Sequence, residues 1–105
     1  MRNLIWAVAL VTALAAPAAA SAETAQEHCS SVASVAHTIM RAHQNGVPLS
    51  DILSIIEQNF PDPEYMIAYQ ELAVIAYGEP RFHTEAAQQR GAADFRDAIH
   101  VWCLS

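Results

Sequence analysis

The segment spanning residues 60–80 constrains the fold most strongly, because it contains the start, the body and the end of one helix. At its start, the carboxylate of Asp62 is placed to accept hydrogen bonds from the free N–H groups of a first turn. Pro63 suits the first helical position, where no N–H is needed. At its end, Gly78 predicts a left-handed cap, and the proline two residues later prevents continuation. We therefore predict a helix over residues 63–77.

The body of this predicted helix is apolar on two sides. One stripe has its members at helical spacing: Tyr65, Tyr69, Leu72 and Ala76. Ile67 and Val74 lie on the opposite side, so the helix needs packing partners on both sides. We predict that it is the central, mostly buried helix. It is the axis of the fold if Ile67 and Val74 face the short second helix while Tyr65, Leu72 and Ala76 face the first and last helices. If either side is open to water, that side is the best candidate for a binding surface.

Two more helices are predicted ahead of this segment. Apolar residues at steps of three and four predict the first over residues 25–44, and the Asn-Gly pair that follows ends it. The second helix is short and mostly apolar. Either Ser50 or the residue before Pro48 is expected to cap its start, and it runs to about Asn59.

The last helix is predicted to begin after Thr84, a good N-cap, and to reach Cys103. Its inward stripe is expected to contain Gln88, Gly91 or Ala92, Phe95, Ala98, Ile99 and Trp102. Gly91 costs up to about 1 kcal/mol inside a helix, which a close crossing by the helix over residues 63–77 would explain. No strand-like alternation or repeat is found in the sequence. We predict an all-α fold, a small bundle of about four helices.

Residues 1–22 are predicted to be a cleaved signal peptide. Arg2 precedes an apolar run of about a dozen residues, and small residues follow at the cleavage positions, with cleavage after Ala22 or after Ala20. The run is shorter than the roughly 20 residues that a membrane span needs. We expect a single helical domain over residues 23–105 that is periplasmic or secreted, with no membrane attachment after cleavage.

Cys29 and Cys103 are the only two cysteines. In an exported chain an even pair is most simply a disulfide, whereas a reactive thiol or an intermolecular bridge is the alternative. A bond between them predicts that the first and last helices of the mature chain pack antiparallel. It would contribute roughly 4 kcal/mol in the chain-entropy model.

The predicted mature chain is strongly acidic, with eleven acidic residues against four arginines, no lysine and a net charge of −7. Neutralising phosphates needs a basic patch, so this charge argues against nucleic acid as a partner. It also argues against an anionic membrane surface. A basic exported protein is the partner that such a surface would attract.

No pattern for catalysis, a metal or a cofactor is found. His37 and His43 are six residues apart and so lie on different helix faces, and HExxH, CxxC, GxSxG and glycine-rich phosphate motifs are absent from the sequence. We therefore predict a protein that is not an enzyme and holds no cofactor. An unrecognised small hydrolase stays open as an alternative. It would need a cluster such as His28, His100 and Glu85.

Five histidines give the chain a second alternative, an acid- or stress-responsive chaperone, because histidines gain charge as the pH falls. Two arginines near helix ends, Arg41 and Arg81, are predicted to cap helix carbonyls, with Glu79 or Asp62 as possible ion partners.

Two segments, MRAHQNGVPL at residues 40–49 and AYGEPRF at residues 76–82, together with Cys103, resemble small exported proteins of proteobacteria and their prophages. The resemblance implies export, a helical fold and a disulfide, and it transfers no catalytic residue. Our leading hypothesis is an exported helical protein that acts by protein contact, in the manner of an inhibitor or immunity protein.

Overall fold

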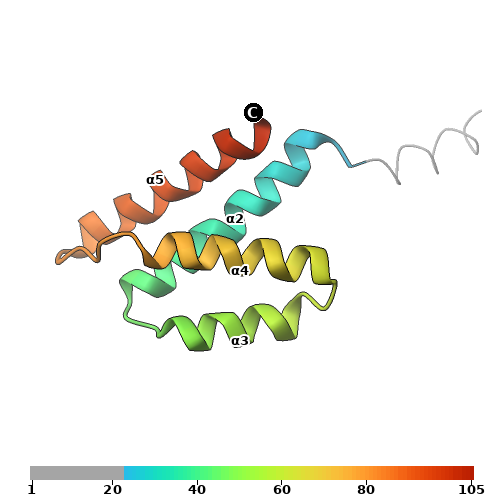
Figure 1. The fold of residues 1–105 in the computed structure, drawn as a ribbon. Helices are drawn as coiled ribbons and strands as arrows, with labels where there is room; N and C mark the ends of the chain where they lie inside the picture. The colour runs from blue at the N-terminus through green and yellow to red at the C-terminus, as the bar shows by residue number, and fades with distance from the viewer. Residues whose placement is uncertain (1–22) are drawn as a thin grey trace, which may run out of the picture.

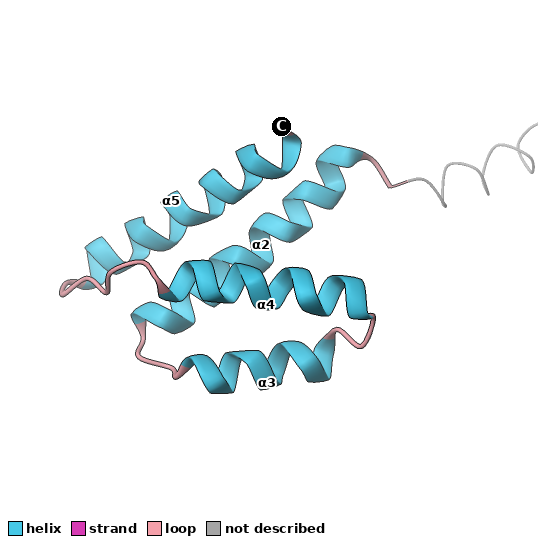
Figure 2. Cartoon of the chain, viewed as in Figure 1, coloured by secondary structure: helices cyan, strands magenta, loops and turns pink. Residues whose placement is uncertain are grey.

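The computed structural model describes residues 23–105, which form four helices joined by short loops (Figures 1 and 2). The helices are α2 (Ala25–Gln44), α3 (Leu49–Asn59), α4 (Pro63–Tyr77) and α5 (Glu85–Leu104). Within these residues no strand is found, so the predicted all-α fold is confirmed. The predicted signal peptide, residues 1–22, lies outside the described residues.

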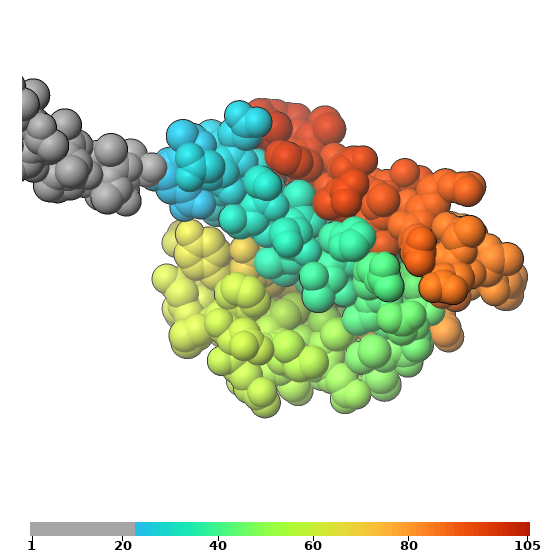
Figure 3. Space-filling view, turned by 180° about the vertical axis from the view of Figure 1, so that it is seen from behind, coloured from blue at the N-terminus to red at the C-terminus, as the bar shows by residue number. Residues whose placement is uncertain are grey.

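The central helix of the fold is α2. It packs along α5 on one side and against α4 on the other, and α3 pairs mainly with α4. Figure 3 shows α2 running between α5 and the α3–α4 pair. The prediction that α4 is the axis of the fold is therefore wrong. The small side chains of Ala33 and Ala36 are buried in α2 and let its neighbours approach closely, which suits α2 to the central place.

The hydrophobic core lies where α2 meets the other helices. It consists of Ala36, Ile39, Met40, Ile52, Ile56, Tyr69, Leu72, Ala73, Ala76, Ala92, Phe95 and Ile99. Four of its members are alanines without any exposed surface, and they come from α2, α4 and α5. Alanines at these positions keep the helix axes close, so the core is made of small side chains filled out by a few large ones.

The helix starts follow local chemistry, with one correction. The predicted caps are confirmed at Asp62, which accepts a hydrogen bond from the Glu64 N–H at 3.0 Å, and at Thr84, which accepts one from the Ala87 N–H at 3.1 Å. Both caps offered for α3, Ser50 and the residue before Pro48, are wrong, because the helix begins at residue 49 and its N-cap is Pro48, with no side-chain cap. The fixed φ of proline, −63° here, directs the chain into the first turn instead.

The helix ends also differ in part from the prediction. As expected, α2 ends in a left-handed Gly46, with φ of +81°, whose N–H donates to the His43 carbonyl at 3.1 Å. Gly78 is not left-handed: its φ is −77° and its ψ −15°. Its N–H donates to the Ile75 carbonyl, and the next N–H donates to the Ala76 carbonyl, both at 3.1 Å. The last turn of α4 thus tightens to three-residue bonds and needs no left-handed residue.

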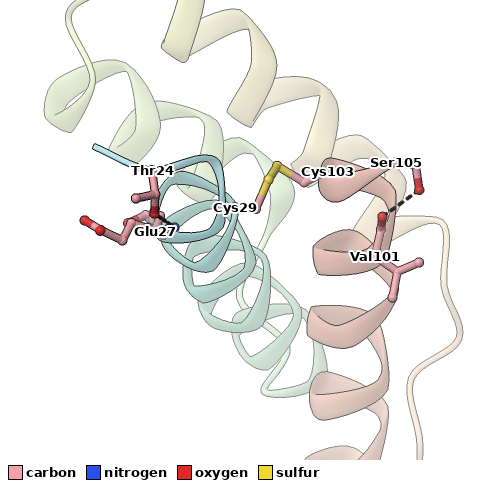
Figure 4. Close-up of a disulfide and its surroundings, with 7 residues drawn as sticks. Thr24, Glu27, Cys29, Val101, Cys103 and Ser105 are labelled. Carbon is pink, nitrogen blue, oxygen red and sulfur yellow. Dashed lines mark hydrogen bonds between the residues drawn. A yellow bond between two sulfur atoms is a disulfide. The ribbon is translucent and has the colours of Figure 1, made fainter. Parts of the chain in front are cut away.

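A disulfide between Cys29 and Cys103 joins the start of α2 to the end of α5, with 5.6 Å between their Cα atoms (Figure 4). This confirms the predicted bond and the antiparallel packing of the two helices. Trp102 was predicted to face inward but is 71% exposed. The reason is rotation: the disulfide fixes Cys103 toward α2, and the preceding residue of a helix points about 100° away. Ala98 is exposed as well.

The role predicted for Gly91 also needs correction. The group above it is the ring of Phe82 in the α4–α5 loop, not α4. A Cβ atom built on Gly91 would lie 2.7 Å from Cε2 of that ring. The glycine therefore leaves room for a loop side chain that covers α5.

Candidate functional site

One side of α4 is open to water. Ile67, Val74 and Ile75 are each more than half exposed, at 54%, 57% and 54%. The opposite side of the same helix, including Leu72 and Ala76, is buried. The condition under which α4 would be the axis of the fold is therefore not met, because α3 leaves Ile67 and Val74 exposed. α4 packs on both α2 and α3, but the side that carries Ile67 and Val74 is left uncovered by the described residues.

The open side of α4 forms the wall of a shallow groove beside α3, with a volume of about 600 Å³. Its lining consists of Leu53 from α3 and of Ile67, Gln70, Glu71, Val74 and Ile75 from α4. We call the four apolar residues of this lining, Leu53, Ile67, Val74 and Ile75, the α4 face. Contiguous exposed apolar residues bordered by polar ones mark interaction sites in soluble proteins.

The charge around the α4 face has one sign. Between residues 49 and 77 there are five carboxylates and no arginine, lysine or histidine. All five are exposed: Asp51, Glu57, Asp62, Glu64 and Glu71. The four arginines of the described chain lie on α2, on α5 and in the loop before α5, and so do all five histidines. The α3–α4 pair is therefore a wholly anionic unit, and α2 and α5 carry the mixed charge.

A second exposed apolar group lies at the disulfide end of α5. Its members are Val101, Trp102 and Leu104, which are 67%, 71% and 52% exposed. Val101 and Leu104 lie about one turn apart on the same side of the helix, and Trp102 points about 100° away from Val101. None of the three lines the shallow groove beside α3, whereas the residues of the α4 face share it.

The loop between α4 and α5 is held by two buried polar side chains at the end of α2. The Gln44 amide donates to the Pro80 carbonyl at 2.9 Å and accepts from the Phe82 N–H at 2.8 Å. His43 bonds through Nε2 to the Glu79 carbonyl at 2.7 Å, so that nitrogen carries a proton. Gln44 was not among the residues that the sequence singled out. The only available signal was a polar residue beside the glycine that ends a helix.

Arg81 has the capping role that was predicted. Its guanidinium donates to the Gln44 carbonyl at 3.3 Å, at the C-terminal end of α2. Neither of its suggested ion partners pairs with it, and the one ion pair among the described residues joins Arg96 to Asp97 on the exposed side of α5. Arg41 borders a polar pocket of about 250 Å³ between the end of α2 and the start of α5.

The cluster that a small hydrolase would need is not assembled. Glu85 is the first residue of α5 and His100 lies fifteen residues later, about 22 Å away along the helix axis. His28 stacks edge-on against Tyr65, with 6.4 Å between ring centres. The Nε2 atom of His100 is buried and has no hydrogen-bond partner among the described residues. No acid and histidine of this set therefore face one another.

Burial lowers the pKa of the His37 imidazole, and the positive charges of Arg96 and Arg41 lower it further. Burial also raises the pKa of the Tyr77 hydroxyl, with a smaller contribution from Asp51. That hydroxyl donates to the Val47 carbonyl at 2.7 Å and ties α4 to the loop before α3. Neither His37 nor Tyr77 lines the groove beside the α4 face.

In the part of the chain that the structure describes, no three side chains of the metal-binding types come together. None of the helices in residues 23–105 combines the length and the apolar character of a membrane span. Comparison with protein families, with curated proteins and with solved structures finds no match for this chain. The α4 face combines exposed apolar side chains, a shallow groove and neighbouring charge of one sign.

Proposed function

We propose that this protein is exported and acts without catalysis, by binding a basic protein through the α4 face. Its concrete form is an inhibitor or immunity protein for a basic cell-wall hydrolase or toxin. Export is supported by the predicted signal peptide and by the disulfide, a bond that persists in oxidising compartments.

The observation that carries the proposal is an apolar groove, lined also by Glu71, on a pair of helices whose only charged side chains are carboxylates. The apolar side chains provide the contact area, since burying an exposed isoleucine or valine is worth about 1.5–3 kcal/mol in full and roughly half of that here. The carboxylates attract a basic partner from solution and repel acidic proteins. The apolar contact and the electrostatic attraction both come from the α3–α4 pair. Together they select a partner that has an apolar surface bordered by basic residues.

The test is affinity capture from a bacterial periplasmic extract with the purified protein, its disulfide intact. Two matched variants accompany it: Val74→Gln in the α4 face and Val101→Gln on α5, both at exposed valines. Captured proteins are identified by mass spectrometry, purified and tested again for direct binding. We expect one basic protein that binds the wild type and Val101→Gln but binds Val74→Gln at least tenfold more weakly.

Three results would count against the proposal. One is a partner that binds both variants equally, which would place the site elsewhere. Another is the absence of any partner at every salt concentration. The third is protection of many unfolded client proteins together with increased dye binding on acidification, which is the behaviour of the acid-responsive chaperone that the sequence left as an alternative.

A further inference from the structure

We infer that the occupant of the groove is a single amphipathic helix with lysine or arginine on its flanks, which lies along α4 and becomes a third helix beside α3 and α4. This inference rests on the proposed function, because it names the element of the basic partner that the α4 face receives.

The shape of the groove fits a helix. Ile67 and Val74 are seven residues apart on α4, so they form a row about 10 Å long, parallel to the helix axis. Leu53 borders the same groove from α3. A helix presents its own apolar residues at steps of three, four and seven, and such a stripe packs between two neighbouring helices. The length of α4, fifteen residues, sets the matching segment at about four turns.

The backbone chemistry also selects a helix. The described part of the chain has no strand and therefore offers no sheet edge to which an extended peptide can add. A segment that enters an apolar groove must have its N–H and C=O groups already paired, because an unpaired polar group loses free energy when it is buried. A helix satisfies this condition by its own internal hydrogen bonds.

The charge requirement follows from the carboxylates next to the groove. Glu71 lines it, Glu64 lies seven residues earlier on the same stripe of α4, and Glu57 lies one turn from Leu53 on α3. A covering helix partly removes these carboxylates from water, which costs free energy unless they are paired. No cation on α3 or α4 can pair with them. The partner must therefore supply lysine or arginine on both flanks of its apolar stripe.

The same charges argue against a second copy of this chain as the occupant. Two α4 faces packed together would bring Glu64 and Glu71 of one copy close to those of the other. Like charges at such positions are destabilising, and α3 and α4 contain no basic residue that compensates. A helix with lysine or arginine on its flanks is instead attracted to the carboxylates at these positions.

The test uses three synthetic peptides of about fifteen residues and the purified protein with its disulfide formed. The first has a leucine stripe flanked by lysines. The second has the same stripe flanked by glutamates, and the third has the composition of the first in an order that breaks the stripe. Binding is measured by fluorescence anisotropy at low and at physiological salt. At low salt we expect the first peptide to bind at least tenfold more tightly than the other two. The difference should be smaller at physiological salt, because salt screens the attraction between lysines and carboxylates.

Matched variants locate the site. Val74→Gln and Glu71→Lys should each weaken binding of the lysine-flanked peptide about tenfold or more. Val101→Gln and Glu85→Lys change the same residue types at exposed positions on α5 and should leave binding within about twofold. Circular dichroism confirms that each variant keeps its helix content, so that a loss of binding reports on the surface.

The outcomes separate the inference from the proposed function. Equal binding of the scrambled peptide, or of the glutamate-flanked one, overturns the inference. So does an equal loss for the α5 variants, or a self-association of the protein that Val74→Gln abolishes. If no peptide binds but the captured protein still depends on Val74, the helical mode fails and the proposed function stands. If the captured protein ignores Val74, the proposed function fails as well.

Discussion

Loss of the disulfide should cost the protein much of its stability. The bond joins Cys29 to Cys103, 74 positions apart, and thereby closes almost the whole described chain into one loop. In the chain-entropy model, opening a loop of this length releases about 4.5 kcal/mol of unfolded-state entropy at 25 °C. A chain of this size has a total free energy of unfolding of only about 4–12 kcal/mol. The double variant Cys29→Ser, Cys103→Ser should therefore be marginally folded.

Without the disulfide, α5 should lose more local stability than the other helices. α5 packs mainly on α2, through Ala92, Phe95 and Ile99, so without the bond its C-terminal end has few other contacts to hold it. Amide hydrogen exchange in the second half of α5 should accelerate more than exchange in α3 or α4. Equal acceleration in all helices would show that the bond acts only on the unfolded chain.

Urea unfolding followed by circular dichroism measures the effect. With a slope of about 1.3 kcal/mol per molar urea, a loss of about 4.5 kcal/mol lowers the midpoint by about 3.5 M. Wild-type protein treated with a reductant should unfold at the same midpoint as the double variant. A midpoint of the double variant within about 0.5 M of the oxidised wild type would refute the reasoning.

Three further predictions concern single side chains. Gln44→Ala should lower the free energy of unfolding by about 2 kcal/mol, because two hydrogen bonds to the α4–α5 loop are lost. The control Gln58→Ala, at an exposed site, should lower it by less than about 0.5 kcal/mol. Similar urea midpoints for the two variants would contradict this. Gly91→Leu should lower the free energy of unfolding by about 1–3 kcal/mol, because the new side chain displaces the Phe82 ring. In a Phe82→Ala background the same substitution should lower it much less. An equal loss in both backgrounds would contradict the contact. The lowered pKa of His37 means that the folded state binds its proton less readily than the unfolded state, so this residue destabilises the fold as the pH falls below about 6.5. His37→Gln should therefore lose less stability than the wild type between pH 7 and pH 5 in urea unfolding, and an equal loss would contradict this.

The helices and their pairing by the disulfide were predictable from the sequence, because their signals are local. The helix boundaries followed from apolar spacing, from the caps Asp62 and Thr84 and from the Asn-Gly pair after α2. The disulfide followed from the oxidising compartment expected for an exported protein. The helix signals depend on residues within one or two turns of each other. The disulfide was predictable because two cysteines allow only one pairing within the chain.

The errors concern contacts between distant parts of the chain. Apolar periodicity identified two apolar sides of α4 but not which neighbours cover them, so Ile67 and Val74 were assigned to the interior although α3 leaves them open. Gln44 was missed because its partners lie 36 and 38 positions later in the sequence. The surface with the strongest functional argument is thus visible only when the predicted stripes are compared with the observed packing.

The most direct test of the account is a map of amide chemical shifts in the isotope-labelled protein during titration with the lysine-flanked peptide. We predict that the largest changes follow α4 and the facing flank of α3, at Leu53, Ile67 and Val74, with little change in α5. Changes concentrated around Val101 and Trp102, or spread evenly over the molecule, would contradict the claim that the open side of α4 is the binding surface.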